Sequence, residues 1–326
     1  MRAHFQWRFL QVLPILMILM ILHAPLTGTR AQETFRGVHV YYKFENDFLS
    51  FDIKGTDKYY SGGNRIGINF PGKKKPDVLH AISFNVEIYT ARGISRTVDM
   101  LTIDDYPYSG ISYLAYRQSR LSKDKRNLFS FGTSVGLTGS QSYGREMQSL
   151  MHKLIHYRLP MGWDGQIELG TMLQVSGEHT HTWYSGRSIK FNTVASMEWG
   201  TIFNRVMVGA EVKIGRNGFA FNEYDLQILP SLNGKRSGFY AFLRPTLTGV
   251  VYNKMLEAQN GNLSVENGRY GKRDIQRVVA GFSLGASWYS RRMGISLVQY
   301  ANSREFRAAG AHKYVAVDII WRFGGR

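Results

Sequence analysis

Alternation of hydrophobic and polar positions dominates the chain after Gln32. The clearest examples are the segments 127–139, 205–215 and 313–323. In the first of these, Phe129, Phe131 and Val135 share one face, while small and hydroxyl residues occupy the other. Successive residues of a β-strand point to opposite faces, so each segment predicts a strand with one apolar side.

The same alternation predicts twelve strands along the chain. We expect them at about 36–46, 59–70, 78–90, 108–120, 126–139, 165–177, 187–199, 204–215, 237–251, 277–289, 293–302 and 313–323. A soluble sandwich would alternate too, but strands of roughly ten residues can cross a bilayer at a tilt. Aromatic residues also gather at the segment ends, where a membrane barrel carries its interfacial girdles. The pattern therefore predicts an all-β fold, a transmembrane antiparallel barrel of about 12 strands. It is weakest between 177 and 237, where the connection 216–236 is longer than a periplasmic turn should be.

Residues 144–166 break the alternation. Their apolar positions follow the spacing of one buried helical stripe: Met147, Leu150, Met151, Leu154 and Ile155. Gln148, His152 and His156 form a second stripe, each one turn from the next. We expect a short amphipathic helix whose apolar stripe packs on the barrel and holds His152 at the seam. A docking helix whose histidines simply face solvent stays open as an alternative.

The long apolar run of the chain lies at its N-terminus. Arg2 and Arg8 precede the run "FLQVLPILMILMILHAPL", and a T-x-A sequence ends at Ala31. This order predicts a secretory signal over residues 1–31, with an uncleaved membrane anchor as the alternative. The barrel domain would then occupy residues 32–326.

Composition narrows the possible partners. The chain has no cysteine, which excludes disulfides, thiolate zinc sites, cysteine nucleophiles and a lipoprotein anchor. Removing Arg2, Arg8 and Arg30 with the signal lowers the formal net charge from +17 to +14. An exported basic protein meets anionic glycolipid or membrane surfaces, so nucleic acid is a poor candidate.

The alternating strands also predict which connections share a side. With both termini in the periplasm, the connections 47–58, 90–107, 140–164, 252–276 and 303–312 lie outside the cell. The sequences "PGKKKPD" and "SKDKRN" become periplasmic turns. The helix is therefore expected to be extracellular.

An oxygen-rich group follows the first predicted strand. Glu45, Asn46 and Asp47, with Asp57 further on, supply the ligand atoms that a hard cation such as calcium prefers. The pair Asn-Asp is equally a common loop opener.

Other possible motifs are weaker. Two G-x-S-x-G matches, at 132–136 and 281–285, lie on predicted strands, whereas a nucleophile elbow needs a strand–turn–helix context. The sequence "GEHTHTW" places His179 and His181 at metal spacing, but a turn that contains two histidines is the simpler interpretation. The sequence contains no P-loop, dinucleotide-binding or zincin motif.

Four motifs in order resemble the LpxR family of lipid A 3'-O-deacylases, which are outer-membrane barrels of Gram-negative bacteria. They are the Asn-Asp pair that ends the first strand, "TDKYYSGG", "DDYPYSG", and "QSLMHKLI" followed by "MGWDGQ". They cover residues 35–166. Beyond that, the resemblance depends on the barrel pattern and on "GVVYN" at 249–253.

The resemblance implies an active site on the outer surface, between barrel wall and helix. There a calcium-dependent hydrolysis would cleave the ester of the 3'-linked acyl group of lipid A. It implies that His152 is the general base that activates water, that Asn46 and Asp47 belong to the calcium-bearing corner, and that Ser61 is a hydroxyl at the site. Asp57 is the second candidate metal ligand. A histidine can take the proton of water near neutral pH, and a bound cation can polarise the ester carbonyl. The implied partner is lipid A or lipopolysaccharide in the outer leaflet, with no obligatory protein partner.

Two positions depart from the family pattern. Arg96 stands where we expect a lysine, and Arg158 stands where we expect an acidic residue. Both guanidinium groups are candidates to bind lipid A phosphates. The missing carboxylate would weaken calcium binding or change the substrate, unless Glu146 or Asp164 replaces it.

Three other functions stay open. The chain could be a non-catalytic barrel that binds lipid or serves a structural role, or a hydrolase that acts on phospholipids. It could also be a pore, although a barrel of this size has a narrow or filled interior.

Overall fold

The computed structural model describes residues 35–324, apart from 36, 51–57, 94, 96, 98–99, 101–104, 168, 217–225, 230–235 and 258–273. The predicted signal peptide, residues 1–31, lies outside the described residues.

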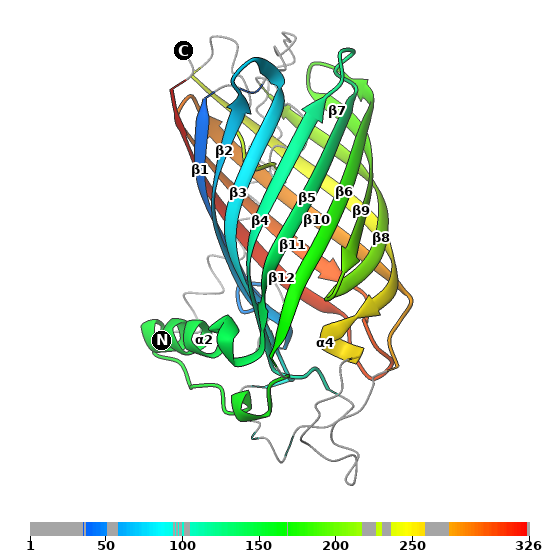
Figure 1. Cartoon of the computed structure of the whole chain (residues 1–326). Helices are drawn as coiled ribbons and strands as arrows, with labels where there is room; N and C mark the ends of the chain where they lie inside the picture. The colour runs from blue at the N-terminus through cyan, green and yellow to red at the C-terminus, as the bar shows by residue number, and fades with distance from the viewer. Residues whose placement is uncertain are drawn as a thin grey trace.

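The described residues form twelve antiparallel strands that close into one barrel (Figure 1). The strands are β1 (Val38–Asn46), β2 (Tyr59–Gly72), β3 (Lys75–Thr90), β4 (Ser109–Leu121), β5 (Asn127–Thr138), β6 (Gly170–Ser185), β7 (Ile189–Gly200), β8 (Phe203–Arg216), β9 (Ser237–Asn253), β10 (Val278–Ser290), β11 (Met293–Asn302) and β12 (His312–Phe323). Each strand pairs with the next, and β12 pairs with β1, so that no edge remains unpaired. The predicted fold class and the number of strands are confirmed.

Strand β6 is the element for which the predicted bounds were most in error. It begins and ends well after the predicted 165–177, and the interpretation of His179 and His181 as parts of a turn was wrong, because both lie within β6. Asn127 Oδ1 lies 3.0 Å from His179 Nε2 and 2.8 Å from His181 Nδ1, and the His179 ring stacks on Phe129. The two G-x-S-x-G matches lie inside β5 and β10, which confirms that neither forms a nucleophile elbow.

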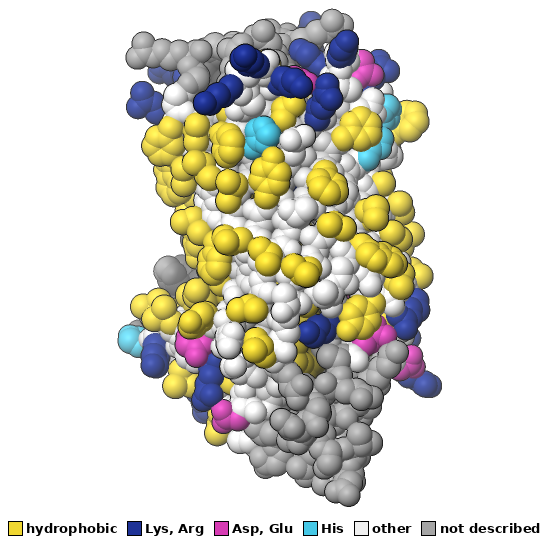
Figure 2. Space-filling model, in the orientation of Figure 1, with side chains coloured by type: hydrophobic (Ala, Val, Ile, Leu, Met, Phe, Trp, Pro, Cys, Tyr) yellow, Lys and Arg dark blue, Asp and Glu magenta, His cyan; other side chains and the backbone are white. Residues whose placement is uncertain are grey.

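The two faces of the barrel wall have opposite character. Outward side chains such as Phe131, Leu173 and Val208 are more than half exposed in the isolated chain. Figure 2 shows hydrophobic side chains around the middle of the barrel, with Lys and Arg gathered at the end that carries the short turns. This outward apolar surface is what a barrel presents to lipid.

Ion pairs and hydrogen bonds occupy the middle of the barrel interior. Glu211 on β8 is the best example: Arg244 Nη2 lies 2.7 Å from its carboxylate and Lys213 Nζ lies 3.6 Å from it. Asn192 Nδ2 also donates to Glu211, at 2.8 Å. Buried charges are tolerated where opposite charges and hydrogen bonds compensate them, as they do here.

Apolar clusters close the barrel interior at both ends. Tyr106, Phe203, Met255 and Phe306 belong to the cluster at the end that carries the long connections. At the short-turn end, the described residues 226–229 of the β8–β9 connection fold into the barrel. Leu229 belongs to a buried apolar cluster with inward residues of five strands, and Asn69 Nδ2 donates to Gln227 O at 2.9 Å. This insertion explains why the connection is longer than the other turns at that end.

Among the described residues, two short α-helices lie at the end opposite the start of β1 and the end of β12. They are α2 (Gly144–Leu154) and α4 (Lys254–Glu257). Two 3-10 turns, η2 (Gly139–Ser142) and η3 (Trp163–Gly165), flank α2. In the part of the chain that the structure describes, no helix is both long and apolar enough to span a membrane.

Candidate active site beneath helix α2

Helix α2 lies against the outside of the barrel wall. Gly144 of the helix contacts Gly110 of β4 there. A Cβ atom on Gly144 would lie 2.8 Å from the Cα of Gly110, so no larger residue fits at this contact. Trp163, after the helix, donates from Nε1 to Gln148 Oε1 at 2.8 Å, and its ring packs edge-on against Tyr108 at 5.4 Å. The close backbone approach and the tryptophan hold the helix at the wall.

The side of α2 that faces the wall is polar, and the prediction that its apolar stripe packs on the barrel was wrong. The buried residues of the helix are Gly144, Gln148 and His152. Leu150 and Leu154 are 52% and 67% exposed. The glycine contact and the Trp163–Gln148 hydrogen bond set this orientation, and neither can be read from helical periodicity.

His152 is buried at this seam, and its ring orientation is defined. Its Nδ1 lies 2.5 Å from the backbone carbonyl oxygen of Arg158. A carbonyl oxygen can only accept, so Nδ1 carries the proton and Nε2 carries the lone pair in the neutral ring. This is the state that a general base needs. His156, one turn later, is exposed, so the alternative of solvent-facing histidines holds for His156 and not for His152.

A β-bulge at Ser61 forms the opposite side of the site. Tyr60 pairs with Tyr89 and Gly62 pairs with Ile88, which leaves Ser61 as an extra residue in β2. The hydroxyl of Ser61 hydrogen-bonds to that of Thr90, and both residues are buried. Bulges often re-aim side chains next to active sites.

Asn46 and Asp47 stand beside this bulge at the end of β1. The backbone amide of Asp47 donates to Ser61 O at 3.2 Å, and Asp47 Oδ2 accepts from the amide of Lys58 at 2.8 Å. Asn46 Oδ1 accepts from the amide of Phe48, also at 2.8 Å. These bonds fix the two side chains at the corner where β1 and β2 leave the barrel wall.

Aromatic contacts connect this corner to the helix. The Phe48 ring lies 6.1 Å from the ring of Tyr157, which lies 5.4 Å from the imidazole of His152. Two ring contacts therefore link His152 to the corner that holds Asn46, Asp47 and Ser61.

The oxygen atoms of this corner are of the chemical types that bind a hard cation. Asp47 supplies a buried carboxylate and Asn46 an amide oxygen, the ligand types that calcium takes. Among the described residues, however, no group of three or more His, Cys, Asp or Glu surrounds one point. Asp57, the second candidate ligand, lies outside the described residues, so the calcium site stays a prediction.

The two candidate phosphate-binding residues are Arg96 and Arg158. Arg96 lies outside the described residues. Arg158 is exposed, and it is its backbone carbonyl that contacts His152. Asp164, considered as a substitute carboxylate, is exposed and pairs with Arg145 at 2.8 Å, and Glu146 is exposed as well.

The sequence analysis assigned no role to three buried polar residues. Gln148 holds Trp163, Thr90 holds Ser61, and Asp105 Oδ1 accepts from the amides of Arg92 and Tyr106 at 3.0 and 2.9 Å. Gln148 and Asp105 stand in motifs that carried the resemblance, which was a usable signal. Thr90 carries no such signal, because only the bulge brings it to Ser61.

Comparisons with known proteins agree with this architecture. The family model described as outer membrane protein LpxR matches residues 15–323. Among solved structures, LpxR from Salmonella typhimurium superimposes with a TM-score of 0.74 at 19% identity, covering 87% of this chain and 100% of that one. The KdgM porin covers 87% of this chain and 99% of its own at 7% identity, with a TM-score of only 0.40. No curated protein sequence matches the chain.

Proposed function

Since the chain belongs to the LpxR family of outer membrane proteins, we propose that it hydrolyses the ester that holds the 3'-linked acyl group of lipid A. The observation that carries the proposal is the environment of His152. A buried imidazole with its Nδ1 proton held by a carbonyl oxygen, on the lipid-facing side of a barrel, is suited to act as a base on a lipid ester.

The reaction needs a base, an ester and water. His152 Nε2 takes a proton from water as the oxygen attacks the ester carbonyl. The tetrahedral intermediate then collapses, the bond between the acyl carbon and the sugar oxygen breaks, and the proton passes from His152 to the leaving oxygen. The products are a free fatty acid and a sugar hydroxyl. The Arg158 carbonyl keeps the ring in the required tautomer and stabilises its protonated form.

The corner opposite the helix supplies the polar groups that would stabilise the oxyanion of the tetrahedral intermediate. Ser61, oriented by Thr90, is a hydroxyl donor at the bulge. Asn46 and Asp47 would hold calcium, which polarises an ester carbonyl when bound. Arg96 and Arg158 would bind the phosphates of lipid A through guanidinium groups.

The site would face the extracellular leaflet, where lipid A resides. If the periplasm holds the end where β1 begins and β12 ends, the end that carries α2 lies outside the cell, because it is the opposite end of the barrel. The apolar clusters and ion pairs that occupy the interior support a site on the outer wall, and they argue against conduction as the function.

The test is mass spectrometry of lipid A from cells that express this protein, with calcium and with a calcium chelator. We expect the loss of one ester-linked acyl group, dependent on calcium and absent with empty vector. Unchanged lipid A beside a correctly inserted barrel would favour the non-catalytic barrel, and release of fatty acid from glycerophospholipids would favour the phospholipid hydrolase.

A further inference from the structure

Helix α2 has three distinct sides, whereas a helix packed on a protein in water needs two. At about 100° per residue, the side formed by Gly144, Gln148 and His152 faces the wall. Next to it on one side lies a polar strip. Next to it on the other side lies an apolar strip, which we call the apolar face of α2: Met147, Leu150, Met151 and Leu154.

The apolar face is largely uncovered. Met147 packs partly against the cluster under the helix, while Leu150 and Leu154 are 52% and 67% exposed. The polar strip is formed by Arg145, Ser149 and Lys153, of which the two charged residues are exposed. Large apolar side chains that remain exposed together mark an interaction surface rather than a water-facing one.

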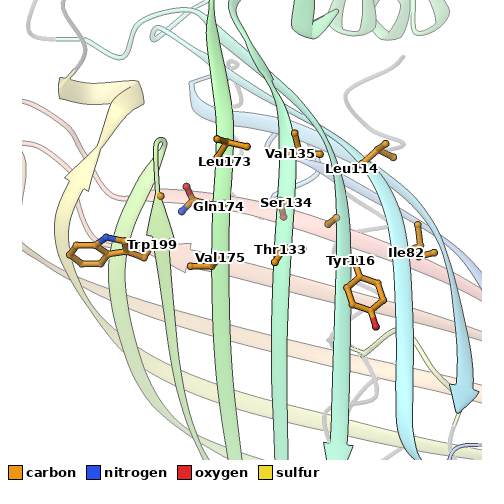
Figure 3. A pocket seen from close by; sticks show the side chains of 12 residues that line it. Ile82, Leu114, Tyr116, Thr133, Ser134, Val135, Leu173, Gln174, Val175 and Trp199 are labelled. Atoms are coloured by element: carbon orange, nitrogen blue, oxygen red, sulfur yellow. The ribbon is translucent and has the colours of Figure 1, made fainter.

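The chain that follows α2 extends this surface toward the barrel wall. Ile155, Leu159 and Met161 are about half exposed, as is Leu169 just before β6. From Leu169 the outward positions of β6 continue with Leu173, which lines a groove of about 620 Å³ in the outer wall. Figure 3 shows Leu173, Val135 and Leu114 as a row across three neighbouring strands, on the side of the groove toward α2.

We infer that the apolar face of α2 contacts the hydrocarbon of the bilayer, in the leaflet at that end of the barrel. The apolar face continues the lipid-facing wall, and lipid is the partner that the wall already has. Arg145 and Lys153, on the opposite strip, remain at the level of headgroups and water, as in helices that lie in a membrane interface. One side of the helix thus contacts the barrel wall, one contacts the membrane and one faces water.

This placement has a consequence for the seam that holds His152. A helix anchored in the leaflet puts the seam beside lipid headgroups, so a lipid can reach it by lateral diffusion. That consequence rests on the proposed function, whereas the membrane contact of α2 does not.

The absence of cysteine makes a direct test possible, because single cysteines can be introduced and labelled specifically. We would attach a nitroxide at Leu154→Cys and, as matched control, at the adjacent Lys153→Cys. Each full-length variant would be reconstituted into vesicles of palmitoyl-oleoyl phosphatidylcholine. Electron paramagnetic resonance would then measure collisions with oxygen, which enters hydrocarbon, and with a water-soluble nickel chelate. Retention of the heat-modifiable barrel would show that each variant is folded.

We expect the label at 154 to collide several-fold more with oxygen than with nickel, and the label at 153 to show the reverse. Equal access of nickel to both positions would overturn the inference. A label at 154 that is shielded from both reagents would also overturn it, because a protein surface would then cover the apolar face. None of these outcomes depends on deacylation, so failure of the proposed function and failure of this inference can be told apart.

Discussion

The two sides of the barrel wall near α2 differ although their residues are adjacent in sequence. Glu45 and Tyr60 point inward and hydrogen-bond to each other at 2.5 Å. Their neighbours Asn46 and Ser61 stand at the outer corner, where the Ser61 hydroxyl meets that of Thr90. One wall thus supports a charged cluster inside and a corner of mostly uncharged groups outside.

The difference separates polar groups that stabilise the barrel from polar groups that are available for a reaction. Inside, carboxylates meet cations directly: Lys43 lies 3.0 Å from Glu45, and Arg244 lies 2.7 Å from Glu211. The charges of such pairs compensate each other, so few of their hydrogen-bonding groups remain available to a substrate. Outside, His152 has a neutral carbonyl as its partner, so it keeps the capacity to accept a proton. Removing a group should therefore affect stability on one side and activity on the other.

The largest effect is expected on the outer side. His152→Ala should lower the rate of lipid A deacylation by about 10²- to 10⁴-fold, the usual contribution of a general base, and leave the heat-modifiable barrel intact. His156→Ala is the matched control, because it removes an exposed imidazole one turn away and should change the rate little. Product mass spectrometry in detergent measures both. A His152→Ala variant as fast as the wild type would refute the assigned base.

Substitutions on the inner side should lower the stability of the barrel. Glu211→Ala leaves Arg244 and Lys213 without their shared carboxylate, which should lower the free energy of unfolding by about 3–5 kcal/mol. The exposed pair of Arg145 and Asp164 provides the control, since Asp164→Ala should cost less than about 1 kcal/mol. Urea titration of the folded barrel in lipid measures both changes. Equal costs would show that the interior ion pairs are as solvated as the surface pair.

The smallest effect is expected for Arg158→Ala. The substitution keeps the backbone carbonyl that orients His152 and removes an exposed guanidinium, so kcat should stay unchanged. KM for lipid A should rise by no more than about fivefold, the scale of an exposed charge contact. Steady-state kinetics separates the two constants. A large loss in kcat would mean that the side chain, and not only the carbonyl, acts in the reaction.

Most of the barrel could be predicted from the sequence, because inward and outward positions alternate within each strand. Strand β11 begins and ends where the alternation predicted, and all twelve strands exist. The predicted bounds of β6 were wrong because His179 and His181 do not have the hydrophobicity of lipid-facing residues. Both nevertheless hold outward positions, His179 against Phe129 and His181 against Trp183. Alternation detects a strand only where its two faces differ in polarity.

The candidate site was only partly predictable. Motifs singled out His152, Asn46, Asp47 and Ser61. The structure places the last three at one corner, which the rings of Phe48 and Tyr157 connect to His152. Thr90 was missed because its partner at Ser61 is set by a bulge between two strands.

What the sequence determined by itself is local: the alternation that makes strands, the helical period of 144–154, and the charges available to each element. The tertiary structure decided what each face meets. It turned the polar stripe of α2 to the wall through the Gly110–Gly144 contact, and it placed residues 226–229 inside the barrel. The physical reason is that periodicity specifies which residues share a face, while the partner of that face depends on backbone approaches between residues far apart in the chain.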